Sequence, residues 1–174
     1  MIVAAMSIFM PYQIAWINDP SPLKLGDKSR RTGWTWCEAY DAVSSRWRRT
    51  NNVRRDYWFS SADESAGVEF IDYCRFWAET LFNQVANVVT EQYLDPDTKR
   101  FATALVIKCP NGHKIVAMTS NPRRFRSKGG DVCLDEFAFH DDPRAMYDAA
   151  APVTQWGGRI RIFSTPNGEG SFYN

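Results

Sequence analysis

The segment KSRRTGWTW, at residues 28–36, has the residue types of a phosphate-binding loop in an altered order. In the common pattern G-x-x-x-x-G-K-[ST], Gly33 and Thr35 match the second glycine and the hydroxyl residue. The lysine position holds Trp34, but Lys28 enters from the other end of the loop and could reach the same phosphates. The glycine would let the backbone approach phosphate oxygens. The threonine would bind Mg²⁺ at a helix start, where the helix dipole favours phosphate.

We therefore predict a nucleotide-binding loop whose ammonium group has moved to Lys28. Arg30 and Arg31 add positive charge to it. The remaining loop residues predicted to contact the nucleotide are Ser29, Arg31, Thr32 and Trp34. A basic turn before a helix has the same composition, so this segment alone leaves both interpretations open.

The stretch VCLDEF, at residues 132–137, places two acids after an apolar run. We predict a buried strand that opens into a cleft at Asp135 and Glu136. Asp135 would hold Mg²⁺ through water, and Glu136 would be the general base that polarises an attacking water. An ordinary acid pair at a strand end is the alternative interpretation.

The segment FSTPNG, at residues 163–168, places Ser164 and Thr165 at the end of a predicted strand. Small hydroxyl residues there can contact a γ-phosphate and move when it leaves. A simple turn is the alternative, because Pro-Asn-Gly is a strong turn signal.

Upstream of the loop, Gln13 carries an amide that could pair with the N6 and N7 edge of adenine, as glutamine does in DNA recognition. A glutamine alone means little. The order of glutamine, loop, acid pair and hydroxyl-rich strand end is what makes coincidence a poor explanation of the four together.

Hydrophobic periodicity predicts the elements that must position these residues. We expect helices at residues 10–18, 34–48 and 143–151, and one that begins at Asp63 or Ser65 and continues past Val68 to Leu81. We expect strands at 54–62, 85–91, 131–136 and 159–163, and a hairpin that joins 101–109 to 113–121. Residues 24–33 are expected to form a polar turn. Alternating strands and helices predict an α/β fold with a mostly parallel sheet and helices on both faces. In such sheets ligands bind beyond the carboxyl ends of the strands, where the acid pair and the hydroxyl pair both fall.

Length and composition fit one globular domain. The chain has 174 residues, 44% of them hydrophobic and 24% charged, and its net charge of +1 argues neither for nor against nucleic acid. Local arginine clusters at 46–55 and 123–128 matter more than the total. No apolar run approaches the roughly 20 residues of a membrane span.

The order and types of these residues resemble the ATPase domain of the large terminase subunit of tailed bacteriophages, across nearly the whole chain. The match is closest to the Mu-like and lambda-like branch, whose Walker A lysine is displaced to the start of the loop, as in KSRRTGWTW. VCLDEFAF resembles the family's Walker B strand and catalytic glutamate, SNPRRFRSKGGD its basic lead-in, and FSTPNGEGSFY its coupling motif. The resemblance implies a P-loop NTPase fold of the ASCE type.

The resemblance also implies a role for each motif residue. Lys28, Gly33 and Thr35 would bind phosphates and Mg²⁺, Asp135 would bind the metal, Glu136 would activate water, Gln13 would contact adenine, and Ser164 and Thr165 would couple hydrolysis to movement. An arginine finger could come from Arg30 in cis, or from Arg124 or Arg126 of a neighbouring copy. A solvated or DNA-facing basic loop is the alternative for each arginine.

The implied function is an ATP- and Mg²⁺-dependent motor that drives double-stranded DNA through a portal protein into a procapsid. The expected partners are double-stranded DNA, the portal protein, the small terminase subunit and further copies of the chain in a ring. The expected location is the cytoplasm of the bacterial host and, transiently, the procapsid portal, with no membrane.

The chain stops at Asn174, just after the coupling motif. We therefore expect residues 1–174 to form an ATPase domain that is incomplete at its C-terminus, lacks the nuclease domain and nuclease activity, and leaves its last strand short of partners. Two other functions stay open: a different DNA-acting P-loop ATPase, such as a helicase, and a non-catalytic prophage remnant. Helicases usually keep the lysine next to Ser or Thr, so Trp34 argues against the first.

Overall fold

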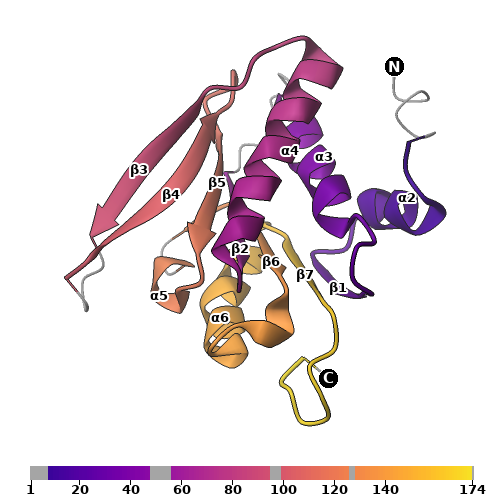
Figure 1. The fold of residues 1–174 in the computed structure, drawn as a ribbon, viewed down its shortest axis with the longest axis vertical. Coiled ribbons are helices and arrows are strands. Elements are labelled where there is room, and N and C mark those ends of the chain that lie inside the picture. The colour runs from indigo at the N-terminus through magenta and orange to yellow at the C-terminus, as the bar shows by residue number, and fades with distance from the viewer. Residues whose placement is uncertain (1–7, 48–55, 95–98, 126–127, 174) are drawn as a thin grey trace.

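The described residues form a seven-stranded sheet with the order β1-β7-β6-β2-β5-β4-β3 (Figure 1). The computed structural model describes residues 8–47, 56–94, 99–125 and 128–173. The strands are β1 (Leu23–Asp27), β2 (Tyr57–Ser61), β3 (Val88–Leu94), β4 (Phe101–Lys108), β5 (Lys114–Thr119), β6 (Asp131–Asp135) and β7 (Ile160–Ser164). The strands β1, β7, β6, β2 and β5 lie side by side in that order, and each pairs in parallel with its neighbours in this group. Strand β4 pairs antiparallel with β5 and with β3. The predicted mostly parallel sheet with a hairpin is confirmed.

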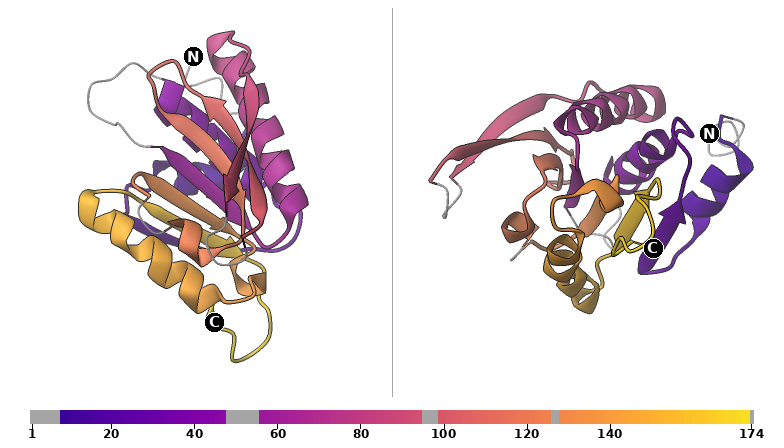
Figure 2. Two further views of the ribbon diagram at one scale, coloured as in Figure 1. Left: turned by 90° about the vertical axis from the view of Figure 1, so that its left-hand side faces the viewer. Right: turned by 60° about the horizontal axis from the view of Figure 1, so that its bottom comes forward.

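Helices cover both faces of this sheet, also as predicted (Figure 2). They are α2 (Pro11–Asn18), α3 (Trp34–Trp47), α4 (Glu64–Phe82), α5 (Pro122–Phe125) and α6 (Pro143–Ala150), with the 3₁₀ helices η1 (Phe137–Phe139) and η2 (Ala151–Trp156). Successive strand residues face opposite cores. Phe163 of β7 packs on the side of α3 and α4, and Ile162 packs on the side of α5 and α6. Within the described ranges, no helix is both long and apolar enough to cross a membrane.

The central strands and the longest helix form where local sequence signals place them. Strands β2, β6 and β7 are buried along their whole length, as expected for parallel strands covered on both faces. Helix α4 is capped by Asp63, whose carboxylate accepts a hydrogen bond from the Ser65 N–H at 2.9 Å. One residue of its predicted buried face is misplaced: Val68 is 51% exposed, and Phe70 enters the core instead.

Strand β1 corrects the prediction of a polar turn over residues 24–33. Its burial pattern is the reverse of the usual one, because both leucines point outward while Lys24 and Gly26 face the core. The Lys24 ammonium group is accommodated there by the carbonyl oxygen of Trp16, to which it donates. Periodicity detects strands by apolar residues on the buried face, so a strand with a lysine and a glycine on that face escapes it.

The expectation that the last strand lacks partners is wrong. Strand β7 lies between β1 and β6, pairs in parallel with both, and is fully buried. The error follows from the missed β1, because residues 23–27 provide the partner for the outer edge of β7.

Gly26 of β1 provides a test of this packing. A Cβ atom at this position would lie 2.7 Å from a ring carbon of Trp34. We expect Gly26→Ala to lower the free energy of unfolding in urea by about 1–3 kcal/mol, the usual range for overpacking. The matched control is Gly129→Ala, because a Cβ there meets no atom within 4 Å, and we expect a change below about 0.5 kcal/mol. Equal effects of the two substitutions would contradict the packing of Trp34 on β1.

Candidate active site

The loop of residues 28–33 joins β1 to α3 at the carboxyl end of the sheet. It begins in register with β7, because the Lys28 N–H donates to the carbonyl oxygen of Ser164 at 3.0 Å. It ends at Gly33, whose carbonyl accepts the Cys37 N–H at 3.1 Å and so starts α3. Arg31 and Gly33 have left-handed backbones, with φ of 58° and 69°. Such residues curl a loop and create concave arrays of N–H groups that bind anions.

Helix α2 holds this loop from one side. The buried amide of Gln13 donates to the carbonyl oxygens of Thr32, at 3.1 Å, and Gly33, at 2.9 Å, and it accepts the Met10 N–H at 2.9 Å. The Tyr12 hydroxyl donates to the same Thr32 carbonyl at 2.6 Å. The Gln13 amide is therefore engaged with the loop backbone, and its contact with adenine stays a prediction. No local sequence signal indicated the tether by Tyr12.

Trp34, at the usual lysine position, packs into an aromatic cluster instead of facing the acids. Its ring lies 4.6 Å from that of Trp16, 5.7 Å from Phe163 and 6.1 Å from Tyr12, measured between centroids. The indole is anchored between α2 and the strands β1 and β7. The side chain at this position thus serves packing and cannot supply a positive charge.

Lys28 supplies that charge at the acid pair. Its Nζ lies 2.5 Å from Oε1 of Glu136 and 3.5 Å from Oδ1 of Asp135, with only 8% of the side chain exposed. The ammonium also lies 5.7 Å from the centroid of the Phe163 ring. The structure therefore brings together the lysine and both acids, which are more than 100 residues apart in the chain.

Asp135 ends β6 beneath the start of α3. The Thr35 hydroxyl donates to its Oδ2 at 2.8 Å, and the Glu136 N–H donates to its Oδ1 at 2.8 Å. Burial raises the pKa of Asp135 to about 6, although the Lys28 charge and the Thr35 hydrogen bond act in the opposite direction. The carboxylate is thus held by three groups, but its charge carries a desolvation penalty in the metal-free protein.

Glu136 turns the chain out of β6 with a left-handed backbone, φ 48°. Its Oε2 accepts hydrogen bonds from the Thr165 N–H at 3.3 Å and the Thr165 hydroxyl at 3.2 Å. Ser164 has a different part: its buried hydroxyl accepts the Ala138 N–H at 3.0 Å and donates to the Thr165 carbonyl at 2.8 Å. Of the two predicted hydroxyl residues, Thr165 touches the acid pair and Ser164 fixes the strand end.

A cavity of about 470 Å³ opens above these groups. One wall is the loop and acid pair, and the other is the start of α4, whose position at the site the sequence did not predict. The α4 side of the cavity comprises Asp63, Ser65, Ala66, Glu69 and Tyr73. Helix α4 reaches the site through its packing on α3, a long-range contact that leaves no local sequence signal.

Of the remaining predicted residues, those that the structure describes do not line this cavity. Ser29 and Arg30 are exposed on the loop. Arg124 donates from Nη1 to the Thr119 hydroxyl at 2.9 Å, at the end of β5, which is separated from β6 by β2. Arg126 lies outside the described residues. Within the described part of the chain, neither Arg30 nor Arg124 forms an ion pair with Asp135 or Glu136.

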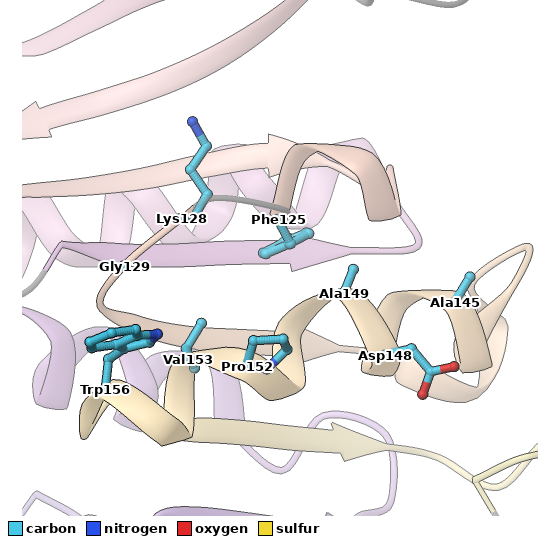
Figure 3. Close-up of a pocket in the computed structure, with 9 residues that line it drawn as sticks. All are labelled: Phe125, Lys128, Gly129, Ala145, Asp148, Ala149, Pro152, Val153 and Trp156. Carbon is cyan, nitrogen blue, oxygen red and sulfur yellow. The ribbon is translucent and has the colours of Figure 1, made fainter.

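A larger hollow, of about 710 Å³, lies between Phe125, Lys128 and Gly129 on one side and the helices α6 and η2 on the other (Figure 3). Its described lining is mostly apolar and includes Phe125, Val153 and the 84% exposed Trp156. None of the predicted site residues that the structure describes is among the lining residues. The smaller cavity is the one that Lys28, Thr35 and the acid pair line.

The oxygen atoms of Thr35 and Asp135 suit Mg²⁺, a hard cation that prefers oxygen ligands. Among the described residues, no group of three or more His, Cys, Asp and Glu side chains could hold a metal. The residues present therefore fit a Mg²⁺ ion that takes most of its ligands from water and phosphate oxygens, and not an all-protein cage.

Comparisons with known proteins found similar sequences and similar folds. A family model described as "Terminase large subunit, T4likevirus-type, N-terminal" matches residues 25–174. The chain is 37% identical over 168 residues to the Mu-like prophage FluMu protein gp28 of Haemophilus influenzae, covering 97% of this chain and 33% of that protein. It is 35% identical over 170 residues to the probable terminase, large subunit gp28, of Escherichia phage Mu, covering 96% and 31%. The chain thus spans about a third of the length of these curated relatives.

Solved structures show the same fold. The Thermus phage P74-26 large terminase ATPase domain superposes with a TM-score of 0.59 at 17% identity, over 92% of this chain and 66% of that one. The large terminase of bacteriophage HK97 gives a TM-score of 0.55 at 14% identity, over 90% and 33%. The fold is therefore that of terminase ATPase domains, a P-loop NTPase fold, as predicted.

The buried Asp135 makes a pH-dependent stability prediction for the metal-free protein. Its pKa is about 6 in the folded protein against an ordinary 3.8, so ionisation opposes folding. The loss of stability caused by ionising Asp135 is absent below a pH of about 3.8, grows between about 3.8 and about 6, and is complete above about 6. Asn carries no such penalty. We expect the melting temperature of Asp135→Asn, relative to the parent in EDTA, to rise between about pH 4 and about pH 7. A difference that does not change with pH would contradict a buried, desolvated carboxylate.

Proposed function

The chain belongs to the terminase large subunit family, and from this premise we propose that it binds ATP with Mg²⁺ and hydrolyses it. The convergence of Lys28, Thr35 and the Asp135-Glu136 pair around one cavity carries the proposal. These residues supply an ammonium group, a hydroxyl, a metal-binding carboxylate and a candidate base. Those are the parts that phosphoryl transfer from a nucleotide to water requires.

Binding would use the loop and the start of α3. The N–H groups of the curled loop and the positive end of the helix dipole would face the phosphates. The Lys28 ammonium, which pairs with Glu136 in the structure, would turn to the phosphate oxygens and leave the glutamate free. Thr35 and Asp135 would hold the Mg²⁺ ion, which neutralises charge on those oxygens.

Hydrolysis would use Glu136 as the base. Its carboxylate accepts a proton from a water molecule, the water oxygen forms a bond to the γ-phosphorus, and the bond from that phosphorus to the leaving ADP oxygen breaks. Thr165 contacts the same carboxylate through its N–H and hydroxyl groups. A movement or protonation of the Glu136 side chain would therefore alter its hydrogen bonds to Thr165 and could shift residues 164–168. This contact supports the predicted coupling role of the segment.

We further propose that hydrolysis drives double-stranded DNA through a portal protein into a procapsid, in the cytoplasm of the bacterial host. The small terminase subunit and further copies of the chain in a ring would be the partners. The family membership supports this role. Arg30 stands on the loop of the same copy as a candidate finger, and Arg124 and Arg126 remain candidates for a neighbouring copy.

Two substitutions separate binding from chemistry. We expect Lys28→Ala to weaken MgATP binding by about 10- to 100-fold in titration calorimetry, because it removes a charge-assisted contact. Glu136→Gln should bind within about threefold of the parent but lower phosphate release by at least about 100-fold. Lys108→Ala, at an exposed lysine on β4, is the control and should match the parent.

The outcomes of this experiment distinguish the alternatives. Unchanged ATP binding by Lys28→Ala would show that the loop assignment is wrong. A parent chain that binds no ATP would favour a non-catalytic remnant. Phosphate release by the parent should also be measured with single-stranded and with double-stranded DNA. Stimulation by single-stranded but not double-stranded DNA would favour a helicase-like ATPase.

The charge of the cavity predicts a strong metal requirement. Four carboxylates line it (Asp63, Glu69, Asp135 and Glu136) against the two cations Lys28 and Arg31. Polyphosphate would be repelled without a metal, so EDTA should weaken ATP binding by at least about tenfold. Glu69→Gln should bind ATP in EDTA more tightly than the parent. Glu79→Gln, an exposed residue further along α4, should not; equal effects of the two would rule out repulsion inside the cavity.

A further inference from the structure

A network of buried charges lies between α3 and the sheet, where an apolar core would be expected. Arg161 of β7 is completely buried, with Nε 3.0 Å from Oε1 of Glu38 and Nη2 2.9 Å from Oδ2 of Asp41. Glu38, also completely buried, accepts hydrogen bonds from the indole of Trp16 at 2.6 Å and from the Tyr57 hydroxyl. The guanidinium thus binds two carboxylates on one helix.

Stability alone does not explain this network. Charges lose their hydration when they are buried, and apolar residues of the same volume are often as stable or more so. Arg161 lies beside the buried Lys24 in the pairing of β1 with β7. Two of its nitrogens, Nε and Nη1, have no hydrogen-bond partner among the described residues, so the contact of Nε with Glu38 is an ion pair without a hydrogen bond. Burial also raises the pKa of Glu38, against the influence of Arg161. Buried ion pairs of this kind are best attested as devices that fix the register of packed elements.

The two carboxylates and the arginine lie close to the site along their own elements. Glu38 follows Thr35 by three residues on α3, so the two share one side of the helix. Arg161 precedes Ser164 by three residues on β7, a span of roughly 10 Å. An apolar contact would tolerate a small slide of α3 along β7. A buried guanidinium paired with two carboxylates resists such a slide. The slide would lengthen both ion pairs and break the directional hydrogen bond from Nη2 to Asp41.

We infer that Arg161 is a positioning residue for the nucleotide site. By holding Glu38 and Asp41, it fixes α3 against β7 and so keeps the Thr35 hydroxyl at Asp135. Loss of this register separates the two oxygen atoms that would hold Mg²⁺. The inference rests on the proposed function, because it assigns a role to Arg161 in Mg²⁺-dependent ATP binding.

The structure offers a matched control at the other end of the same helix. Arg46, in the last turn of α3, pairs with Asp131 at the start of β6, and both side chains are 1% exposed. This pair is as buried as that of Arg161. It lies eleven residues beyond Thr35, a distance of about 16 Å along the helix. Its disruption should cost stability without moving the start of α3.

The experiment compares Arg161→Lys with Arg46→Lys. Each keeps the positive charge and loses the planar fork, so each should lower the melting temperature. The decisive readout is the ratio of ATP affinity in Mg²⁺ to ATP affinity in EDTA. We expect this ratio to fall by about tenfold or more in Arg161→Lys. Substitution of residues that orient metal ligands typically lowers metal affinity by a factor of this size. We expect it to stay within about twofold of the parent in Arg46→Lys. Glu38→Gln keeps the shape of the side chain and should lower the same ratio. It replaces Arg161→Lys in the test if that variant does not fold.

Each outcome bears on a defined claim. A parent chain whose ATP binding does not respond to Mg²⁺ would overturn the proposed function, and this inference with it. A parent that shows the metal effect, together with Arg161→Lys and Glu38→Gln variants that retain it in full, would overturn the inference alone. The same loss in Arg46→Lys would mean that general destabilisation of α3 is the cause, which also overturns it.

Discussion

The site depends on the ammonium group of Lys28, which lies 2.5 Å from Glu136 and 3.5 Å from Asp135. Two adjacent carboxylates, one of them buried, repel each other, and a cation between them offsets that repulsion. The fold has to deliver this cation from the far end of the loop. It does so through β1, which runs parallel to β7 and continues its pairing at Lys28. Strand β1 therefore positions the cation of the site, although its buried face carries a lysine and a glycine.

Moving the lysine leaves the usual position free for packing. Trp34 occupies it and packs against Gly26, Trp16 and Phe163, so the indole joins α2 and the start of α3 to the sheet. Gln13 completes the support by binding two loop carbonyls. The loop is thus held by an aromatic cluster and one amide, and not by a lysine anchored next to the threonine. In this candidate phosphate loop, the residue that carries the charge and the residue that anchors the loop are therefore different.

Part of this could be read from the sequence, and the physical reasons differ from element to element. The central strands were predictable because parallel strands covered on both faces are continuously apolar, and the acids at the end of β6 stand out against that run. Strand β1 was missed because its inward residues are Lys24 and Gly26. The α4 wall with Glu69, and the pairing of Arg161 with Glu38, depend on contacts between distant segments, which no local pattern records. The roles of the individual site residues stay predictions.

A crystal structure with Mg²⁺ and a non-hydrolysable ATP analogue tests the central claim most directly. The account predicts that Nζ of Lys28 leaves Glu136 and lies about 2.7–3.2 Å from a phosphate oxygen, while Trp34 stays packed against Gly26. It also predicts the metal between the Thr35 hydroxyl and Asp135. A bound analogue whose phosphates are held by another cation, such as Arg31, with Lys28 still paired to Glu136, would contradict it.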